Sequence, residues 1–390
     1  MKVLVVGSGM YVTGRDGSGH GTVMAALAEY SKSFPLEVTV YSGRTQSKTS
    51  VDESTQRINT ILGTRLKCAF TSKEKMTLDE LLDKEAFDLS IISVPDHLHF
   101  ECSKATLNRR VATLVVKPLT RTIREAIELI RLAEANRTYA AVEFHKRWDE
   151  SNVQAKASVA QQLIGELSYI DVNYSQRISI PTKTFAGWAE KTNIFQYLGV
   201  HYVDLIHFIT GYYPSRVMAH GQAGILVKRG INTFDAVHAA ICWKHPQTNH
   251  QFYSHFNTHW IDPECTSAMS DQKLKIVGSL GRIELDQKNR GIEMVTTQRG
   301  IQHLNPYFAE FLLNPDGSYY FNGYGAKSIL TFLGDVRSLK EGKISLTALN
   351  ATRPTFSSSL VSTAVIEKVN ESMIMNSPWM DIDDHLWHTS

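Results

Sequence analysis

Residues 1–12 read MKVLVVGSGMYV, an apolar run that leads directly into a turn with two glycines, Gly7 and Gly9. The run is far too short to be the core of a signal peptide or a membrane span, so it predicts a buried first strand. Two glycines after such a strand allow a tight turn and let a pyrophosphate approach the backbone, with Met10 and Tyr11 beside it. We therefore predict a dinucleotide-binding turn.

This turn differs from the compact fingerprint in two respects. Val12 stands at the position of the third glycine, and a polar stretch over residues 13–21 precedes a predicted helix over residues 22–30. The alternative is a glycine-rich surface loop, but a position directly after the first strand is where a Rossmann domain carries its phosphate turn.

The rest of the chain divides into two regions with different sequence patterns. Up to about residue 145, short β-branched runs alternate with helical periodicity, which predicts a doubly wound parallel sheet; the runs cover residues 3–6, 38–41, 89–94, 112–116 and 139–144. From residue 167 the chain becomes rich in strands, at 167–174, 216–225, 236–243, 251–260, 274–277 and 282–285.

We therefore expect an α/β Rossmann domain over residues 1–146, followed by an α+β domain over residues 147–390 with a large, mostly antiparallel, open-faced sheet. Helices are predicted around residues 193–210, 324–339 and 358–373, and the last is expected to pack back on the first domain. The alternating strands of the second domain could bury an apolar face between subunits, which predicts a homodimer or homotetramer.

Composition excludes several classes of function. The 390 residues carry a formal net charge of +2 and no long basic block, which argues against a nucleic-acid surface, and no apolar run is long enough for a membrane span. The four cysteines are widely spaced, as expected in a reducing cytoplasm, and the scattered His, Cys and acidic residues form no metal-ligand motif.

The end of the second predicted strand bears on the choice of cofactor. An acidic residue there would bind the ribose hydroxyls of NAD, but the sequence has Ser42, followed by Arg44. An arginine suits a 2'-phosphate, and no carboxylate is present in this segment to repel it. The pattern favours NADP over NAD, although Arg44 could also be a solvated loop residue.

Two distant segments suggest redox chemistry on a hydroxyl group. Lys117, followed by Pro118, comes at the end of the apolar run over residues 111–116, where open α/β sheets bind ligands. His201, far downstream, can supply proton transfer. The alternatives are a lysine that extends to solvent and a histidine that only pairs with Asp204.

Taken in order, these motifs are SVPDHLH at 93–99, VVKPL at 115–119 and GVHYVD at 199–204, with FHKRWD at 144–149 and IGEL at 164–167 between them. The series resembles the Gfo/Idh/MocA family, named for glucose-fructose oxidoreductase and inositol dehydrogenase. The resemblance implies a Rossmann domain joined to an open-faced sheet. It also implies hydride transfer between a nicotinamide cofactor and a sugar or cyclitol.

The resemblance also implies roles for single residues. Lys117 would be the active-site lysine, next to the cofactor, and His201 the histidine that transfers the proton. Pro95 would lie near the cofactor. His99 would be the motif histidine of the adjoining cofactor loop, where it helps to shape the loop.

The chain departs from the family pattern at two positions. Val116 stands where the family commonly has a glutamate, and Tyr197 where it commonly has an aspartate. The first change removes a possible partner for Lys117. Tyr197 precedes His201 by four residues on a predicted helix, so it could contact substrate, or it could be a buried structural tyrosine.

Arg147 and Trp188 are further candidates for contact with substrate, because cationic and aromatic groups suit a polar ring with one apolar face. In the expected oxidation, His201 takes the hydroxyl proton while Lys117 stabilises negative charge on the oxygen. Two other functions stay open: a non-catalytic regulator that senses a sugar or nucleotide, and a glycosidase that uses NAD for transient oxidation.

Overall fold

The computed structural model describes residues 1–14 and 20–387, so part of the polar stretch after the glycine turn lies outside the described residues. These residues form two compact units. The first contains residues 1–120, 124–149 and 307–359, and the second contains residues 121–123, 150–306 and 360–390.

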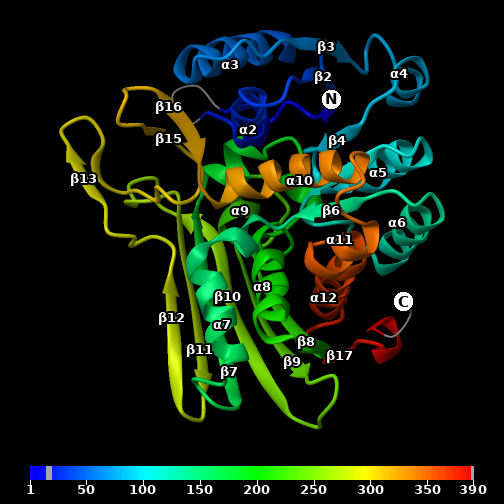
Figure 1. Cartoon of the computed structure of the whole chain (residues 1–390). Coiled ribbons are helices and arrows are strands. Elements are labelled where there is room, and N and C mark those ends of the chain that lie inside the picture. The colour runs from blue at the N-terminus through cyan, green and yellow to red at the C-terminus, as the bar shows by residue number, and fades with distance from the viewer. Residues whose placement is uncertain (15–19, 388–390) are drawn as a thin grey trace. The chain divides into compact units, whose positions relative to one another are not determined.

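The first unit is built on a six-stranded parallel sheet in the order β3-β2-β1-β4-β5-β6 (Figure 1). This is the strand order of a dinucleotide-binding Rossmann domain. The strands are β1 (Lys2–Val6), β2 (Glu37–Ser42), β3 (Cys68–Ser72), β4 (Leu89–Ile92), β5 (Ala112–Val116) and β6 (Ala140–Glu143). The predicted parallel sheet is therefore confirmed, with β3 as one strand that the sequence pattern did not indicate.

Helices connect and cover these strands, as crossovers between parallel strands require. Before the second unit begins they are α1 (Met10–Thr13), α2 (Thr22–Ser31), α3 (Ser47–Leu62), α4 (Leu78–Lys84), η1 (Asp96–Leu98), α5 (His99–Asn108), α6 (Ile123–Ala135) and η2 (His145–Trp148). Apolar side chains of α2 and α3 form one core with the sheet, which includes Met24, Ile58 and Val5.

The chain returns to the first unit with a hairpin and two helices: β15 (Glu310–Leu313), β16 (Tyr319–Asn322), α10 (Tyr324–Lys340) and α11 (Leu346–Thr352). Ile329 and Phe332 of α10 are buried in the same core as the sheet. Sequence periodicity predicted α10 within the domain over residues 147–390, whereas the helix is grouped with the first unit, because nothing local in a helix records which distant sheet it packs on.

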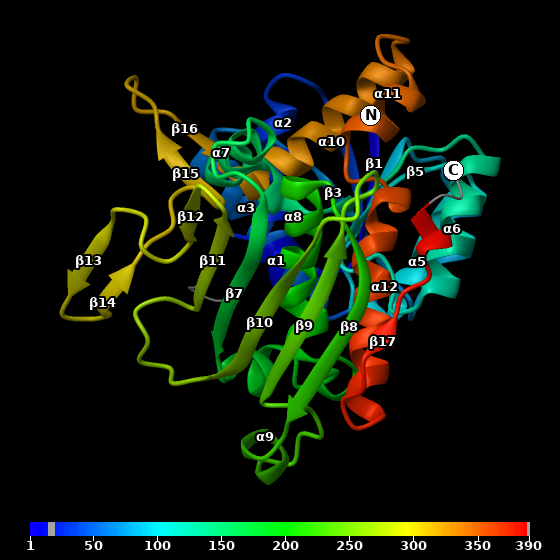
Figure 2. The same cartoon turned by 90° about the horizontal axis from the view of Figure 1, so that it is seen from below.

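The second unit is built on a mixed seven-stranded sheet in the order β12-β11-β7-β10-β9-β8-β17 (Figure 2). All neighbouring pairs are antiparallel except β7 and β10, so the predicted mostly antiparallel sheet is confirmed. Its strands are β7 (Leu167–Arg177), β8 (Tyr213–Gln222), β9 (Ala236–Lys244), β10 (Gln251–Asp262), β11 (Ser270–Gly278), β12 (Gly281–Asp286) and β17 (Met380–Asp381).

The remaining elements of this part of the chain are short, apart from three helices. They are α7 (Glu150–Ala160), η3 (Ile180–Thr184), η4 (Ala189–Lys191), η5 (Phe195–Gly199), α8 (Val200–Thr210), α9 (Ile225–Lys228), the hairpin of β13 (Glu293–Thr296) and β14 (Gly300–His303), α12 (Phe356–Ile374) and η6 (Asp384–Trp387).

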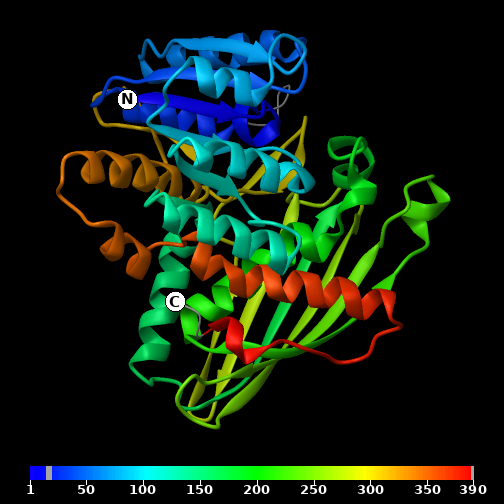
Figure 3. The ribbon, with the colours of Figure 1, turned by 90° about the vertical axis from the view of Figure 1, so that its right-hand side faces the viewer.

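The last long helix, α12, was expected to pack back on the first domain, and that contact stays a prediction. Most of α12 belongs to the second unit (Figure 3), where Val361, Val365 and Val369 are buried against the sheet. These apolar residues recur every four positions, so they form one face of the helix, and the sheet offers a continuous apolar surface to cover.

The two faces of the large sheet differ in chemistry. On β10, Phe252 and Phe256 are buried among the helices of the same unit, whereas the alternate positions His255 and Asn257 are exposed. Asn257 bonds to His238 Nδ1 on β9 at 2.9 Å. The alternation therefore reflects an apolar face covered by the chain's own helices, and the expected burial of an apolar face between subunits does not follow from it.

The packing of Phe256 yields a test of this assignment. Its ring lies 5.2 Å from that of Phe195, and only 1% of its surface is exposed. We expect Phe256→Ala to lower the free energy of unfolding by about 3–5 kcal/mol because it opens a cavity in the core. His255→Ala, one residue away on the exposed face, should change it by less than about 0.5 kcal/mol. Urea unfolding monitored by tryptophan fluorescence measures both, and equal effects would contradict the assignment of faces.

Candidate functional site

The glycine turn after β1 has the geometry that a phosphate turn requires. Gly7 has a φ of +112°, and a Cβ there would lie 2.0 Å from the carbonyl oxygen of Ser93, so no other residue fits. Among the residues that the structure describes, a Cβ on Gly9 would meet no atom within 4 Å. The backbone at Gly9 is therefore open to a ligand, and Met10 and Tyr11 follow directly in α1.

Ser42 and Arg44 lie where the sequence placed them, at the end of β2, but their surroundings are more complex. The buried Ser42 hydroxyl lies 2.8 Å from that of Ser8 in the glycine turn, while Arg44 is exposed. Glu74 accepts a hydrogen bond from the backbone of Thr45 at 3.2 Å. Its bonds to Thr45 and the nearby Arg44 charge lower the pKa of Glu74.

The expectation that no carboxylate opposes a 2'-phosphate here was therefore wrong in one respect. Glu74 follows β3, the strand that the sequence pattern did not indicate, and parallel pairing brings the ends of β2 and β3 together. The positive charge of Arg44 thus acts on an acidic neighbour, Glu74.

His99 connects the loops that follow β4 and β5. Its Nδ1 lies 2.6 Å from the carbonyl oxygen of Pro118, and its Nε2 lies 3.0 Å from that of Val94. Burial lowers the pKa of His99, and Asp96 opposes that shift. Only 1% of the side chain is exposed. With both ring nitrogens directed at backbone carbonyls, His99 shapes the loops and offers neither nitrogen to a cofactor.

Pro95 and Lys117 are positioned by these two loops. Pro95 lies directly before η1, and Lys117 follows the last residue of β5 and forms a cis peptide bond with Pro118. The Lys117 side chain is 8% exposed. Burial lowers the pKa of Lys117 from 10.5 to about 7, while the nearby carboxylates of Glu143 and Asp96 oppose the shift.

A lysine with a pKa of about 7 exchanges protons near neutral pH, which an exposed lysine does not do. The alternative of a solvent-directed lysine is therefore contradicted by its burial. The predicted cofactor residues of this unit lie at or just after the carboxyl ends of β1, β2, β4 and β5, where parallel α/β sheets bind ligands. They are Gly7, Gly9, Met10, Tyr11, Ser42, Arg44, Pro95 and Lys117.

Arg147 also belongs to the first unit. It lies in η2, with its guanidinium carbon 6.0 Å from the centre of the Phe144 ring. This cation–π contact orients the base of the side chain. The role of Arg147 in contact with substrate stays a prediction.

The second unit holds the other predicted residues. Tyr197 lies in η5, and His201 follows in the first turn of α8, with 2% of its surface exposed. Burial raises the pKa of Tyr197 to about 12, which the side chain of Gln176 partly opposes. The phenol is therefore neutral at physiological pH and serves as a hydrogen-bonding group rather than as a phenolate.

Trp188 joins Tyr197 through a shared aromatic neighbour. The ring of Phe185 lies 4.2 Å from that of Trp188 and 4.6 Å, edge to face, from that of Tyr197. Sequence analysis named Trp188 and Tyr197 separately. Phe185 links them, and its own place in a loop carried no signal of this contact.

Glu143 is, like Glu74, a residue of the first unit that the sequence pattern did not point to. It ends β6, is 1% exposed, and bonds to His145 Nδ1 at 3.0 Å and to the Ser328 hydroxyl at 2.5 Å. A signal was present, because residues 140–142 are apolar and a carboxylate at the end of such a strand needs partners.

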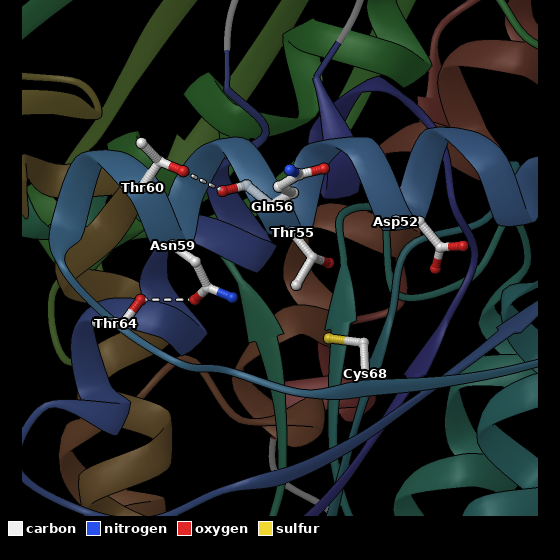
Figure 4. A pocket seen from close by; sticks show the side chains of 7 residues that line it. All are labelled: Asp52, Thr55, Gln56, Asn59, Thr60, Thr64 and Cys68. Carbon is white, nitrogen blue, oxygen red and sulfur yellow. Dashed lines mark hydrogen bonds between the residues drawn. The ribbon is translucent and has the colours of Figure 1, made fainter.

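A shallow hollow along α3 is separate from all of these residues (Figure 4). It is lined by Asp52, Thr55, Gln56, Asn59, Thr60, Thr64 and Cys68. Thr64 donates to Asn59 within it, and burial raises the pKa of the Cys68 thiol to about 11, so this thiol is not reactive near neutral pH. The hollow contains none of the predicted site residues.

The described residues also bear on metal binding and on membrane spanning. Over residues 1–14 and 20–387, no three His, Cys, Asp or Glu side chains are grouped so that they could hold a metal ion. None of the helices within these ranges is long and apolar enough to cross a membrane.

Comparison with curated proteins identifies oxidoreductases. A scyllo-inositol 2-dehydrogenase (NADP(+)) of Bacillus subtilis is 26% identical over 150 residues, which are 37% of this chain and 41% of that protein. An uncharacterised oxidoreductase of Schizosaccharomyces pombe is 30% identical over 159 residues, 39% of this chain and 40% of that protein. The matches thus span less than half of these relatives.

Solved structures show the same fold along nearly the whole chain. The scyllo-inositol dehydrogenase of Lactobacillus casei with bound NAD(H) and scyllo-inositol superimposes with a TM-score of 0.65 at 15% identity, covering 97% of this chain and 98% of that one. The myo-inositol 2-dehydrogenase of Lactobacillus plantarum superimposes with a TM-score of 0.67 at 16% identity, covering 98% and 99%.

Two family models match the sequence itself. The oxidoreductase family model with an NAD-binding Rossmann fold matches residues 1–144, and the C-terminal domain model of the same family matches residues 152–284. Together they span most of the chain and follow its order of folds. The chain belongs to the Gfo/Idh/MocA oxidoreductase family.

Proposed function

We propose that the protein is an NAD(P)-dependent oxidoreductase that transfers a hydride between a nicotinamide cofactor and a hydroxyl-bearing carbon of a cyclitol or sugar. The observation that carries the proposal is the buried Lys117, with a pKa of about 7, on the same edge of a Rossmann sheet as the open glycine turn. A chain that only bound a dinucleotide would have no need to bury a lysine there, because burial of a charge is costly.

The reaction needs two kinds of protein group. When bound, the nicotinamide cofactor accepts or supplies the hydride. In alcohol oxidation, the imidazole of His201 accepts the hydroxyl proton, and the Lys117 ammonium stabilises the negative oxygen. In ketone reduction, the imidazolium of His201 returns the proton to the oxygen, and the Lys117 ammonium polarises the carbonyl.

The substrate class rests on the second unit and on the relatives. Tyr197 is a neutral hydrogen-bonding phenol, and the Trp188–Phe185 pair adds an apolar aromatic surface next to it. A cyclitol or sugar ring has hydroxyl groups at its rim and C–H groups on its faces, which suits this combination. The inositol dehydrogenases among the similar proteins support the same class.

For the cofactor, we propose a preference for NADP over NAD. Arg44 is exposed at the end of β2, and Ser42 occupies the position where an acid would bind ribose hydroxyls. Glu74 weakens this preference because its carboxylate accepts a hydrogen bond from Thr45 and lies near the Arg44 charge. The B. subtilis relative is named as an NADP(+) enzyme, whereas the L. casei structure holds NAD(H).

Loss of either proposed proton-handling group tests the reaction. We expect Lys117→Met and His201→Asn each to lower kcat by about 10²–10⁴-fold with a cyclitol substrate, because each removes acid–base or electrostatic catalysis. The measurement is the absorbance of the reduced nicotinamide. His207→Asn, on the same helix α8 and bonded to the Tyr212 carbonyl, is the matched control and should keep its activity. Normal turnover in both test variants would refute the proposal.

The pH dependence of ketone reduction tests the role of Lys117. Reduction needs the ammonium form, and the pKa of Lys117 is about 7, so kcat/KM should be highest at acidic pH and fall as the pH rises through about 7. Lys117→Arg keeps its charge at every accessible pH, so this limb should disappear in that variant. A wild-type limb that persists unchanged in Lys117→Arg would assign the titration to another group.

Cofactor preference is tested by charge changes in the loop after β2. We expect Arg44→Ala to weaken NADP binding by about tenfold or more and to leave NAD binding nearly unchanged, because a charged hydrogen bond to the 2'-phosphate is lost. Glu74→Gln should tighten NADP binding, since it removes the opposing carboxylate. Titration of protein fluorescence with each cofactor gives both constants. An unchanged NADP-to-NAD affinity ratio in Arg44→Ala would end the proposed preference.

A further inference from the structure

Lys117 has no carboxylate before it in sequence, but one lies on the adjacent strand. Strands β5 and β6 are parallel neighbours, and Val116 is the register partner of Glu143. Lys117 follows Val116 directly. Glu143 thus lies at the carboxyl edge of the sheet, beside Val116, the position where this chain lacks the motif glutamate.

The carboxylate of Glu143 is held in place by two elements of the first unit, η2 and α10. His145 Nδ1 lies 3.2 Å and 3.0 Å from its two oxygens, and the Ser328 hydroxyl of α10 donates to Oε1 at 2.5 Å. The charge of Glu143 also acts on Tyr11 of α1. Burial raises its pKa, and the Glu143 charge raises it further, so Tyr11 is a neutral neighbour.

Aromatic packing also orients the histidine that contacts Glu143. The His145 ring stacks on Tyr324 at 5.6 Å with an interplanar angle of 29°, and Phe308 meets it edge-on at 5.2 Å. A ring confined in this way keeps Nδ1 directed at the carboxylate. A buried carboxylate with fixed partners acts on its surroundings as a preorganised charge.

We propose that Glu143, on the neighbouring strand, takes the role of the carboxylate that the family motif places before the lysine, and that its charge shifts Lys117 toward the ammonium form. Glu143 is then a positioning residue that acts through Lys117. Its effect on catalysis rests on the proposed function, whereas its effect on the charge of Lys117 does not.

The charged and titratable groups that face Lys117 within the first unit set the expected size of the effect. Burial favours the neutral amine, Glu143 opposes this most strongly, and Asp96 opposes it less. His99 also faces Lys117, and burial together with the Lys117 charge lowers the pKa of His99, so this ring is neutral where Lys117 titrates. Removal of the Glu143 charge should therefore move the titration of Lys117 to lower pH, by about one unit or more for a near opposite charge.

The competing explanation is that Glu143 only anchors α10 through Ser328. That role predicts a loss of stability in Glu143 variants with no change in Lys117. A matched control is Asp335, a buried carboxylate of the same unit that bonds to Arg353 at 2.7 Å and to Tyr139 at 3.2 Å. Asp335→Asn also removes a buried, hydrogen-bonded charge, but the pKa of Lys117 depends on burial, Glu143 and Asp96 and not on Asp335.

The experiment measures the titration of Lys117 directly, in the full chain without substrate or cofactor. Lysines are dimethylated with ¹³C-formaldehyde, and NMR follows their methyl shifts against pH; the signal missing in Lys117→Met assigns Lys117. We expect a lower midpoint in Glu143→Gln, an unchanged midpoint in Asp335→Asn, and a midpoint close to wild type in Glu143→Asp, which restores the charge.

The outcomes separate this inference from the proposed function. An unshifted Lys117 midpoint in Glu143→Gln overturns the inference, even if the enzyme turns over. A shifted midpoint supports it, even if no cyclitol or sugar is oxidised. If Glu143→Gln does not fold, the double variant Glu143→Leu/Ser328→Ala removes the carboxylate together with its hydroxyl donor, leaves that pair without an orphaned partner, and must show the same shift.

If the enzyme is active, a second measurement links the titration of Lys117 to catalysis. The fall of kcat/KM for reduction should move to lower pH in Glu143→Gln by the same interval as the NMR midpoint. A lowered rate at every pH with an unmoved limb would reflect a structural defect and would contradict the proposed control of Lys117.

Discussion

The imidazole of His99 lies between two strand ends and contacts a backbone carbonyl in each, that of Val94 after β4 and that of Pro118 after β5. Burial lowers the pKa of His99, so its imidazole is neutral near pH 7 and donates a hydrogen bond to one of these two carbonyls. The first loop also packs against the glycine turn, because the carbonyl of Ser93 occupies the space beside Gly7. One buried ring thus relates the phosphate turn, Pro95 and Lys117.

Burial of Lys117 is the second constraint, and it follows from the first. A lysine at this strand end, held by the loop that His99 fixes, loses most of its hydration, and its pKa falls to about 7. Desolvation alone would make the amine a poor electrostatic partner for an oxygen anion. The carboxylates of Glu143 and Asp96 offset that tendency, so the unit holds a lysine poised between its two charge states.

The elements that sequence analysis predicted well share one property: their signal is local. Strands β1, β4 and β5 are short apolar runs between helical segments, and such runs indicate strands buried on both faces. Strand β3 escaped because it is an edge strand in which only Ser72 is fully buried, so its pattern resembles a loop. Glu74, which follows it, escaped for the same reason.

Other features depended on pairing across the chain. Nothing in α10 indicates that it packs on the first unit, and nothing in residues 140–143 indicates that Glu143 lies beside Val116 or accepts a bond from Ser328, 185 residues later. Such contacts arise when the register of two strands and the packing of a distant helix are set together.

The sequence by itself determined the order of the two folds, the glycine turn, Lys117 and His201 as candidates, and the family resemblance, because each depends on a few adjacent residues whose chemistry is legible in isolation. Only the tertiary structure decided that His99 contacts two loop carbonyls and that Tyr197 stays a neutral phenol. It also decided that Glu74 lies near Arg44 and that Glu143 lies beside Val116, where the motif glutamate is missing. Burial and electrostatic neighbours determine the charge of a side chain, and both come from residues that are distant in sequence.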